Sequence, residues 1–346
     1  MRAFFVLLLL CLPSVASAQD MTWRWQDHET VSFRIQTYMQ FRPGEVRLYA
    51  AKNLKARVED IALGLEVDCK NTVLTRRAQE LECRVRRAEL GLGTGSTDQD
   101  KLEAIATEYA GLLSVALIQV ELNREGRVKT LDLEGIPKDT EREGARHELL
   151  RMIVGRAFAA LEVELPKGGD TRGEPWTQGG LPLAMRLPVT AGTVGKAKVN
   201  HTIESQAGDV VTIQTQGQGS AQSGSELEAS KAGMGAARVV QTVWVGTSKF
   251  DVKRGHLVSN DYRIQGTFTA AGNAAGSDFF MTQVGLAEWI EDWDAEAAAK
   301  QAAIDAEIAA QAAAQEAARK MAEDEARALK AAEQDATIGP AEGAAE

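Results

Sequence analysis

Side chains that could carry out catalysis or bind a metal are few in this chain and are widely spaced. The four histidines are His28, His147, His201 and His256, and none stands in an H-E-x-x-H pair or beside a plausible ligand set. The sequence holds no G-x-S-x-G, C-x-x-C or G-x-x-x-x-G-K-[ST] motif. We therefore expect no metal and no cofactor, and a protein that is more readily a binder than an enzyme.

His201 is the position that we single out for possible chemistry. Its alternation groups it with Ala197, Val199 and Ile203 on the inner face of a predicted strand. A lone histidine on such a face is more often a core residue than a catalyst, and a general base also needs an orienting partner. A hydrolase that uses His201 with an unidentified carboxylate is therefore the least favoured functional hypothesis.

Three aromatic residues join His201 as weak candidates for ligand binding. They are Trp244, Tyr262 and Phe268. Tyr262 and Phe268 share one predicted strand face with Ile264. Two interpretations of Tyr262 stay open at this point, a core position or a hydroxyl that reaches into a cavity.

Cys69 and Cys83 are predicted to form a disulfide. Alternation places both on the apolar side of adjacent predicted strands, where their thiols can meet. In the chain-entropy model, closing a loop of about 15 residues stabilises a protein by about 3 kcal/mol. Two buried free thiols are the alternative.

The first eighteen residues are expected to be a signal peptide. Arg2 provides a positive start, an apolar run and Pro13 follow, and Ala16-Ser17-Ala18 matches the pattern that signal peptidase cleaves. The mature chain would begin at Gln19, exported to the periplasm or beyond, with an outer-membrane association as one destination. No later stretch is long and apolar enough to span a bilayer as a helix.

The charge is concentrated at the C-terminus. The chain has a formal net charge of -10, and residues 291–346 hold 14 acidic and 5 basic side chains. Nucleic acid is therefore not expected as a partner, because phosphate binding requires a basic field.

Alternating residues predict long strands, and 258–270 is the clearest example. Further strands are predicted at 31–41, 46–50, 54–69, 81–90, 116–122, 128–133, 197–205, 210–216, 239–252 and 279–290. Helical spacing predicts helices near 100–114 and 140–160, the second with a capping box at Thr140 and Glu143. The fold class is therefore α+β, a long-stranded, curved antiparallel β-sheet covered by one or two helices.

Two segments divide the chain by composition. Residues 291–346 are predicted to form an acidic, alanine-rich helical tail, and by composition they resemble the charged helical stalks of bacterial envelope proteins. A β-rich body occupies 19–290, and a glycine- and proline-rich connection near 167–182 is a possible boundary between two subdomains. Residues 217–237, rich in Gly, Ser and Ala, are predicted to be a hairpin tip or a disordered loop.

These patterns favour an exported, non-enzymatic protein of the bacterial cell envelope. Its curved sheet would bind an apolar ligand, a lipid or acyl chain, or a protein partner. The alternative is an envelope scaffold or assembly component that acts through its helical tail. Sequence alone does not separate these two hypotheses.

Overall fold

The computed structural model describes residues 21–24, 26–42, 46–47, 57–75, 78–93, 99–123, 125–167, 169, 174–178, 193–223, 237–270 and 279–337. The chain divides into two units after Ile290. We call the first unit the body and the second the tail. The predicted signal peptide, residues 1–18, lies outside the described residues.

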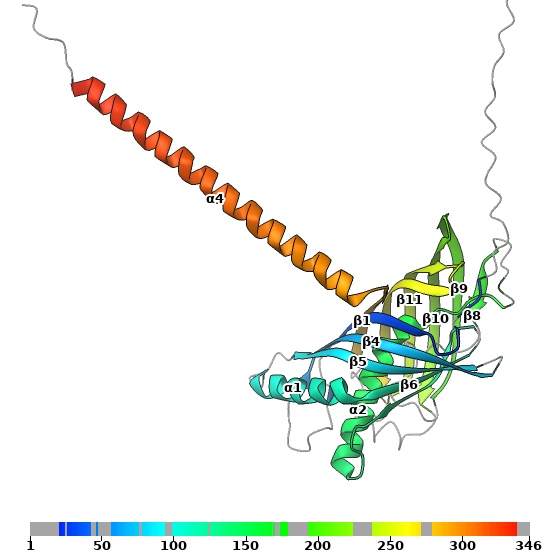
Figure 1. Cartoon of the computed structure of the whole chain (residues 1–346). Helices are drawn as coiled ribbons and strands as arrows, with labels where there is room; N and C mark the ends of the chain where they lie inside the picture. The colour runs from blue at the N-terminus through cyan, green and yellow to red at the C-terminus, as the bar shows by residue number, and fades with distance from the viewer. Residues whose placement is uncertain are drawn as a thin grey trace, which may run out of the picture. The chain divides into compact units, whose positions relative to one another are not determined.

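The body is built on one curved antiparallel sheet of eleven strands, in the order β7-β6-β5-β4-β1-β13-β12-β11-β10-β9-β8 (Figure 1). Its strands are β1 (Thr30–Arg42), β4 (Asp60–Thr75), β5 (Ala78–Gly93), β6 (Leu117–Asn123), β7 (Val128–Glu134), β8 (Trp176–Gln178), β9 (Thr193–Ala207), β10 (Val210–Ser223), β11 (Ala237–Asp251), β12 (His256–Ala270) and β13 (Phe279–Ile290). β2 (Val46–Arg47) and β3 (Arg57–Val58) form a separate pair. The predicted α+β fold with a long-stranded antiparallel sheet is confirmed, and strands on both sides of 167–182 belong to the same sheet.

Three α-helices and one short 3-10 helix complete the described structure. They are α1 (Gln99–Val115), α2 (Glu141–Phe158), the 3-10 helix η1 (Ala159–Leu161) and α4 (Trp293–Thr337). The capping box predicted for α2 is present, since Thr140 Oγ1 accepts from the Glu143 amide and Glu143 Oε2 accepts from the Thr140 amide.

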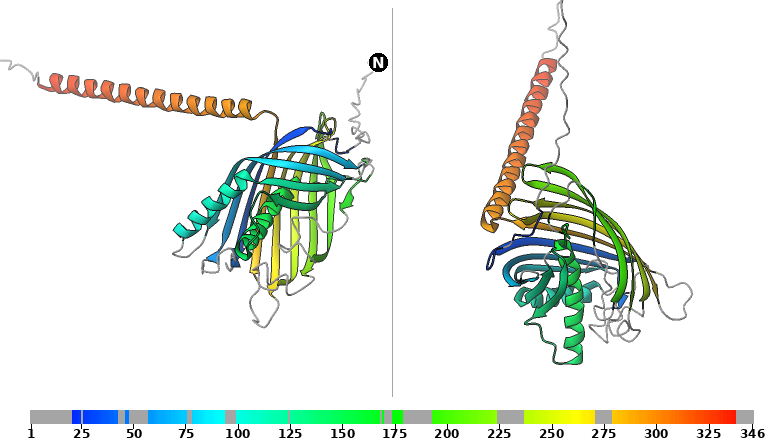
Figure 2. Two further views of the ribbon diagram at one scale, coloured as in Figure 1. Left: turned by 60° about the horizontal axis from the view of Figure 1, so that its bottom comes forward. Right: turned by 90° about the vertical axis from the view of Figure 1, so that its right-hand side faces the viewer.

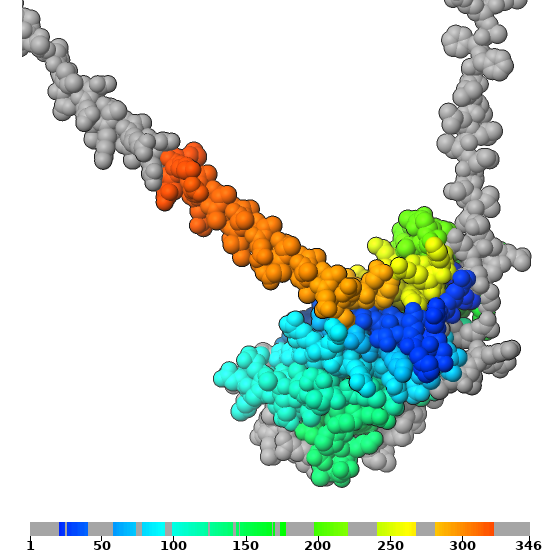
Figure 3. All heavy atoms as spheres, viewed as in Figure 1, coloured from blue at the N-terminus to red at the C-terminus, as the bar shows by residue number. Residues whose placement is uncertain are grey.

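Neighbouring elements cover the edge of β5 that faces away from β4. β6 pairs with residues 78–84 of β5, and α1 packs against β5 (Figure 1). A helix beside a strand edge prevents pairing with another chain. Figure 3 shows the side chains of β1, β4 and β5, blue to cyan, packed together on one face of the body.

The N-terminal strand of the sheet lies beside its C-terminal strand. β1 pairs with β4 on one side and with β13 on the other, from Ser32 opposite Ile290 to Arg42 opposite Phe280. The two halves of the chain therefore meet at β1, in the middle of the sheet.

One sequence-based prediction requires correction. The strand predicted at 210–216 continues to Ser223, whereas the Gly and Ser content of 217–223 predicts a tip or loop. β9 and β11 both pair with this stretch. Hydrogen bonds from two sides therefore outweigh its weak intrinsic strand preference. Residues 224–236 of the same prediction lie outside the described residues.

The disulfide predicted between Cys69 and Cys83 is present. The two residues face each other on β4 and β5 with Cα atoms 3.9 Å apart, and both side chains are fully buried. The alternation of apolar residues in the sequence therefore predicted both that the two cysteines pair and the sheet face on which they lie.

The tail is one long helix with a solvent-exposed surface where its side chains are described. α4 spans 45 residues, about 68 Å at 1.5 Å per residue. Among its described side chains, the apolar residues Ile304, Ile308 and Met321 are exposed. None of the described helices meets the length and hydropathy needed to cross a bilayer.

Replacing both cysteines should test the contribution of the disulfide. The C69A/C83A double variant is expected to lose about 3 kcal/mol of unfolding free energy, because its unfolded chain is no longer constrained. Urea unfolding followed by circular dichroism measures the change. The wild-type protein in excess reductant is the control and should match the variant. Equal stability of the oxidised wild type and the double variant would contradict the prediction.

Candidate functional site

The concave face of the sheet holds the end of α2 and the segment that follows it. α2 contacts β1, β4 and β7, and η1 contacts β12 and β13 (Figure 2). Residues 153–166 are buried without interruption. We call this run the buried strap. Because it has no solvent-facing side, its backbone groups must find partners within the protein.

Polar side chains from the sheet bind the carbonyl groups of the buried strap. The Tyr262 hydroxyl donates to the Arg156 carbonyl at 3.0 Å, and Gln283 Nε2 donates to the same oxygen at 3.1 Å. Asn260 Nδ2 donates to the Ala160 carbonyl at 2.8 Å. The last carbonyls of a helix lack partners within the helix. These three side chains therefore complete the end of α2.

The Tyr262 ring fits this position because its neighbours on both adjacent strands are glycines. Gly246 on β11 and Gly285 on β13 are its register partners. A Cβ added to Gly285 would lie 2.5 Å from Cζ of the Tyr262 ring, well inside contact distance. Glycine at 285 thus lets the ring lie across the sheet and bring its hydroxyl to α2.

Arg156 brings a positive charge into the interior. Its Nη1 donates to Gln283 Oε1 at 3.4 Å, and the residue is 5% exposed. Burial lowers the pKa of Arg156 to about 10, so the guanidinium remains charged at neutral pH. Burial raises the pKa of the Tyr262 phenol, which therefore remains protonated and able to donate.

Three of the four predicted ligand-binding residues lie together on this inner face. His201, Thr215, Gly246 and Tyr262 are consecutive register partners across β9, β10, β11 and β12. Trp244 lies one inward position away on β11, with its ring centroid 5.8 Å from that of Tyr262. Phe268 belongs to β12, but its side chain lies outside the described residues. The role of these residues in ligand binding stays a prediction.

The surroundings of His201 are uncharged. Its Nδ1 lies 2.9 Å from Thr215 Oγ1, and the Trp176 ring stacks on it with centroids 5.3 Å apart. Burial lowers the pKa of His201 to about 4. The imidazole is therefore neutral at pH 7 and a weak base. Its hydrogen-bond partner is a hydroxyl rather than the carboxylate that the hydrolase hypothesis requires.

Sequence reasoning missed the polar partners of the buried strap. The sequence predicts only that the aliphatic stem of Arg156 joins the covering stripe of α2, and it does not identify Gln283 or Asn260 as partners. A usable signal existed in residues 152–161, where Arg156 is the single charged residue. A helix that is apolar on all sides is buried on all sides.

A hollow lies beside the N-terminal half of α2. It has a volume of about 630 Å³ and is open to solvent. Its lining is Leu131, Asp132, Lys138, Gly144, His147, Glu148 and Arg151. Glu148 and Arg151 pair with each other at 2.6 Å, and His147 Nε2 donates to the Leu133 carbonyl at 2.9 Å. Several of its polar groups therefore already have partners within the protein.

Neither models of known protein families nor curated protein sequences match this chain. Within the described ranges, no cluster of three or more His, Cys, Asp or Glu side chains is arranged to hold a metal ion.

Adding a methyl group at position 285 should disturb the contact between Tyr262 and α2. Gly285→Ala is expected to cost about 1–3 kcal/mol of unfolding free energy, because its Cβ overlaps the ring. Gly64→Ala on β4 is the matched control, since the nearest atom to its Cβ is 3.9 Å away. Chemical unfolding compares the two. A loss at Gly64 as large as that at Gly285 would contradict the ring contact.

The buried imidazole of His201 should make stability depend on pH. Because its pKa falls from 6.5 to about 4 on folding, the unfolded chain binds the proton first as the pH drops. The stability contribution is present above pH 6.5 and is lost as pH falls through 4. Its size is on the order of 3 kcal/mol.

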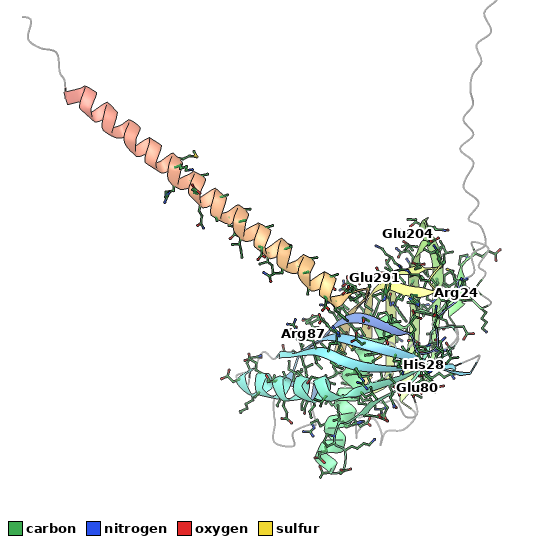
Figure 4. All side chains as sticks on the ribbon, in the orientation of Figure 1. Arg24, His28, Glu80, Arg87, Glu204 and Glu291 are labelled. Atoms are coloured by element: carbon green, nitrogen blue, oxygen red, sulfur yellow. A yellow bond between two sulfur atoms is a disulfide. The ribbon has the colours of Figure 1, made fainter. Side chains whose placement is uncertain are left out.

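His201→Phe should therefore lose less stability than the wild type between pH 7 and pH 4, measured by urea unfolding at each pH. His28→Asn is the control, because the His28 side chain is 66% exposed and lies at the surface (Figure 4). Parallel pH profiles for the wild type and His201→Phe would contradict the assignment.

Proposed function

We propose that this protein is a non-enzymatic binding protein of the cell envelope. It holds an apolar ligand, a lipid or acyl chain, against the inner face of β9 to β12. The observation that carries this proposal is the contrast between the two faces of these strands.

The inner face of β9 to β12 is apolar, aromatic or neutral in its described part. Its buried side chains include Val199, His201, Val211, Ile213, Thr215, Thr242, Trp244, Ser248, Phe250, Leu257, Asn260, Tyr262 and Ile264. Charged residues of the same strands, such as Lys198, Glu204 and Arg263, point outward and are exposed, and Figure 4 shows Glu204 at the surface. This face is thus suited to an acyl chain.

The elements that cover the inner face of the sheet also favour β9 to β12 as the binding region. α2 and η1 contact chiefly β1, β4, β7, β12 and β13. Beyond them, Trp176 stacks on His201, and Trp23 meets Phe250 edge to face at 5.2 Å. The short segments around Trp23 and Trp176 therefore cover part of β9 to β12, whereas α2 covers the other half of the sheet. An acyl chain would lie against the sheet in place of these ring contacts and gain about 0.8 kcal/mol per buried methylene.

The scaffold hypothesis stays a prediction. α4 provides a long helix with exposed side chains, but its large apolar residues are too few for a coiled-coil seam through several heptads. Export through a cleaved signal peptide also stays a prediction.

Lipid binding can be tested on the purified full chain. We expect an organic extract of the protein to contain acyl lipid by mass spectrometry, and a fluorescent fatty acid to bind and be displaced by unlabelled lipid. A Val199→Thr/Ile264→Thr variant should bind about tenfold more weakly, because one tenfold step corresponds to about 1.4 kcal/mol of lost apolar contact.

A Lys198→Thr/Arg263→Thr variant is the matched control, because these residues neighbour the first pair on the opposite face. Its affinity should equal that of the wild type. An empty extract together with no probe binding would exclude an apolar ligand.

A further inference from the structure

The segment before β1 has a firmly attached part and a part that reaches the inner face. We call residues 26–29 the root and residues 21–24 the tip. In the root, the His28 amide donates to the Asn71 carbonyl, and the Asn71 amide donates to the Glu29 carbonyl, both at 2.8 Å. Glu29 Oε1 lies 3.4 Å from His256 Nε2. The root is therefore fixed to two strands of the sheet, β4 and β12.

Trp23 in the tip lies between strands that are far apart in the sheet. Its ring meets Phe250 of β11 edge to face at 5.2 Å. A Cβ added to Gly126, in the turn between β6 and β7, would lie 2.6 Å from Trp23 Cε2 and 2.8 Å from the Val163 carbonyl of the buried strap. β5, β4, β1, β13 and β12 separate β6 from β11 in the sheet order. The indole therefore fills a place where the curvature of the sheet brings distant elements together.

The tip resembles an apolar ligand in its chemistry. Met21 is 1% exposed, and its flexible thioether chain is of the kind that fills apolar gaps. Trp23 lies against Phe250, which belongs to the inner face of β11. An acyl chain that contacted the same side of the Phe250 ring would have to take the place of Trp23.

The tip is held by backbone hydrogen bonds outside the strand ladders. The Met21 amide donates to the Gly169 carbonyl at 2.8 Å, and the Arg24 amide donates to the Gly255 carbonyl at 3.2 Å. Chain ends that are not part of a sheet open at the lowest free energies in a fold. The tip can therefore leave the inner face while the root stays attached.

Trp176, the other ring that covers this face, is held differently. It belongs to β8, which pairs with β9 from Trp176 opposite His201 to Gln178 opposite Val199. Its Nε1 also donates to the Glu164 carbonyl at 2.9 Å. Of the two rings, Trp23 is thus the one that can leave without breaking a strand pairing.

We propose that the tip is a displaceable plug, which occupies the Phe250 end of the binding face in the free protein and is expelled by the acyl chain of the ligand. This inference rests on the proposed function and adds its regulation. The protein's own N-terminal segment competes with the ligand for the inner face.

Hydrogen exchange of the unaltered full chain tests the plug directly. Saturating palmitate should speed the exchange of the Met21 and Arg24 amides at least tenfold, because their hydrogen bonds break when the tip leaves. The amides of His28 and Asn71 are the internal control and should exchange at an unchanged rate, because the root stays attached. Unchanged or slower exchange of the tip with palmitate bound would overturn the plug.

Affinities supply the second readout. Trp23→Ala should bind cis-parinaric acid about three- to tenfold more tightly than the wild type, because a plug that is open about a third to a tenth of the time weakens binding by that factor. Trp289→Ala is the matched control. Trp289 is also half-buried, but its ring packs beside His256 at 6.0 Å, so its loss should not raise the affinity.

The outcomes separate the plug from the proposed function. If the wild type binds cis-parinaric acid and Trp23→Ala binds it no more tightly, the plug is wrong and the proposed function stands. Failure of the wild type and of Trp23→Ala alike to bind would remove the proposed function and the plug with it.

Discussion

The body depends on satisfying the carbonyl groups at a helix end that is buried inside a sheet. α2 enters the concave face, and the residues of its C-terminal turn are buried. Each carbonyl left without a donor would cost about 1–3 kcal/mol. The sheet supplies the donors from Tyr262, Gln283 and Asn260. The polar residues on an otherwise apolar face are therefore explained first by this requirement.

That requirement also separates two parts of the inner face. Around β12 and β13, Tyr262 and Gln283 are hydrogen-bonded to each other at 2.6 Å and to the buried strap. Around β9 to β11, the nitrogens of His201 and Trp244 lack such partners among the described residues. Polar groups of similar burial thus differ in whether the protein itself satisfies them.

Sequence patterns predicted those parts of the fold that depend on local periodicity. Alternation identified most of the long strands and paired Cys69 with Cys83 across two of them, and the spacing of Thr140 and Glu143 located the start of α2. These features follow from the period of a strand or from a contact three residues away. The face on which Tyr262 lies could be predicted for the same reason.

The partners of those side chains could not be predicted in this way. Parity places Tyr262 on the inner face, but its bond to Arg156 joins residues 106 positions apart and depends on how α2 crosses the sheet. The small size of Gly285 has meaning only once Tyr262 is known to lie beside it.

The central place of β1 has a consequence for the unfinished chain. One edge of this thirteen-residue strand pairs with β4, which is close in sequence. The other edge pairs with β13, which ends only at Ile290. A nascent or truncated chain that stops short of β13 therefore presents a long row of unpaired amides and carbonyls, flanked by apolar side chains. Such an edge is a template for joining other chains. Addition of β13 thus both closes the fold and removes this open edge.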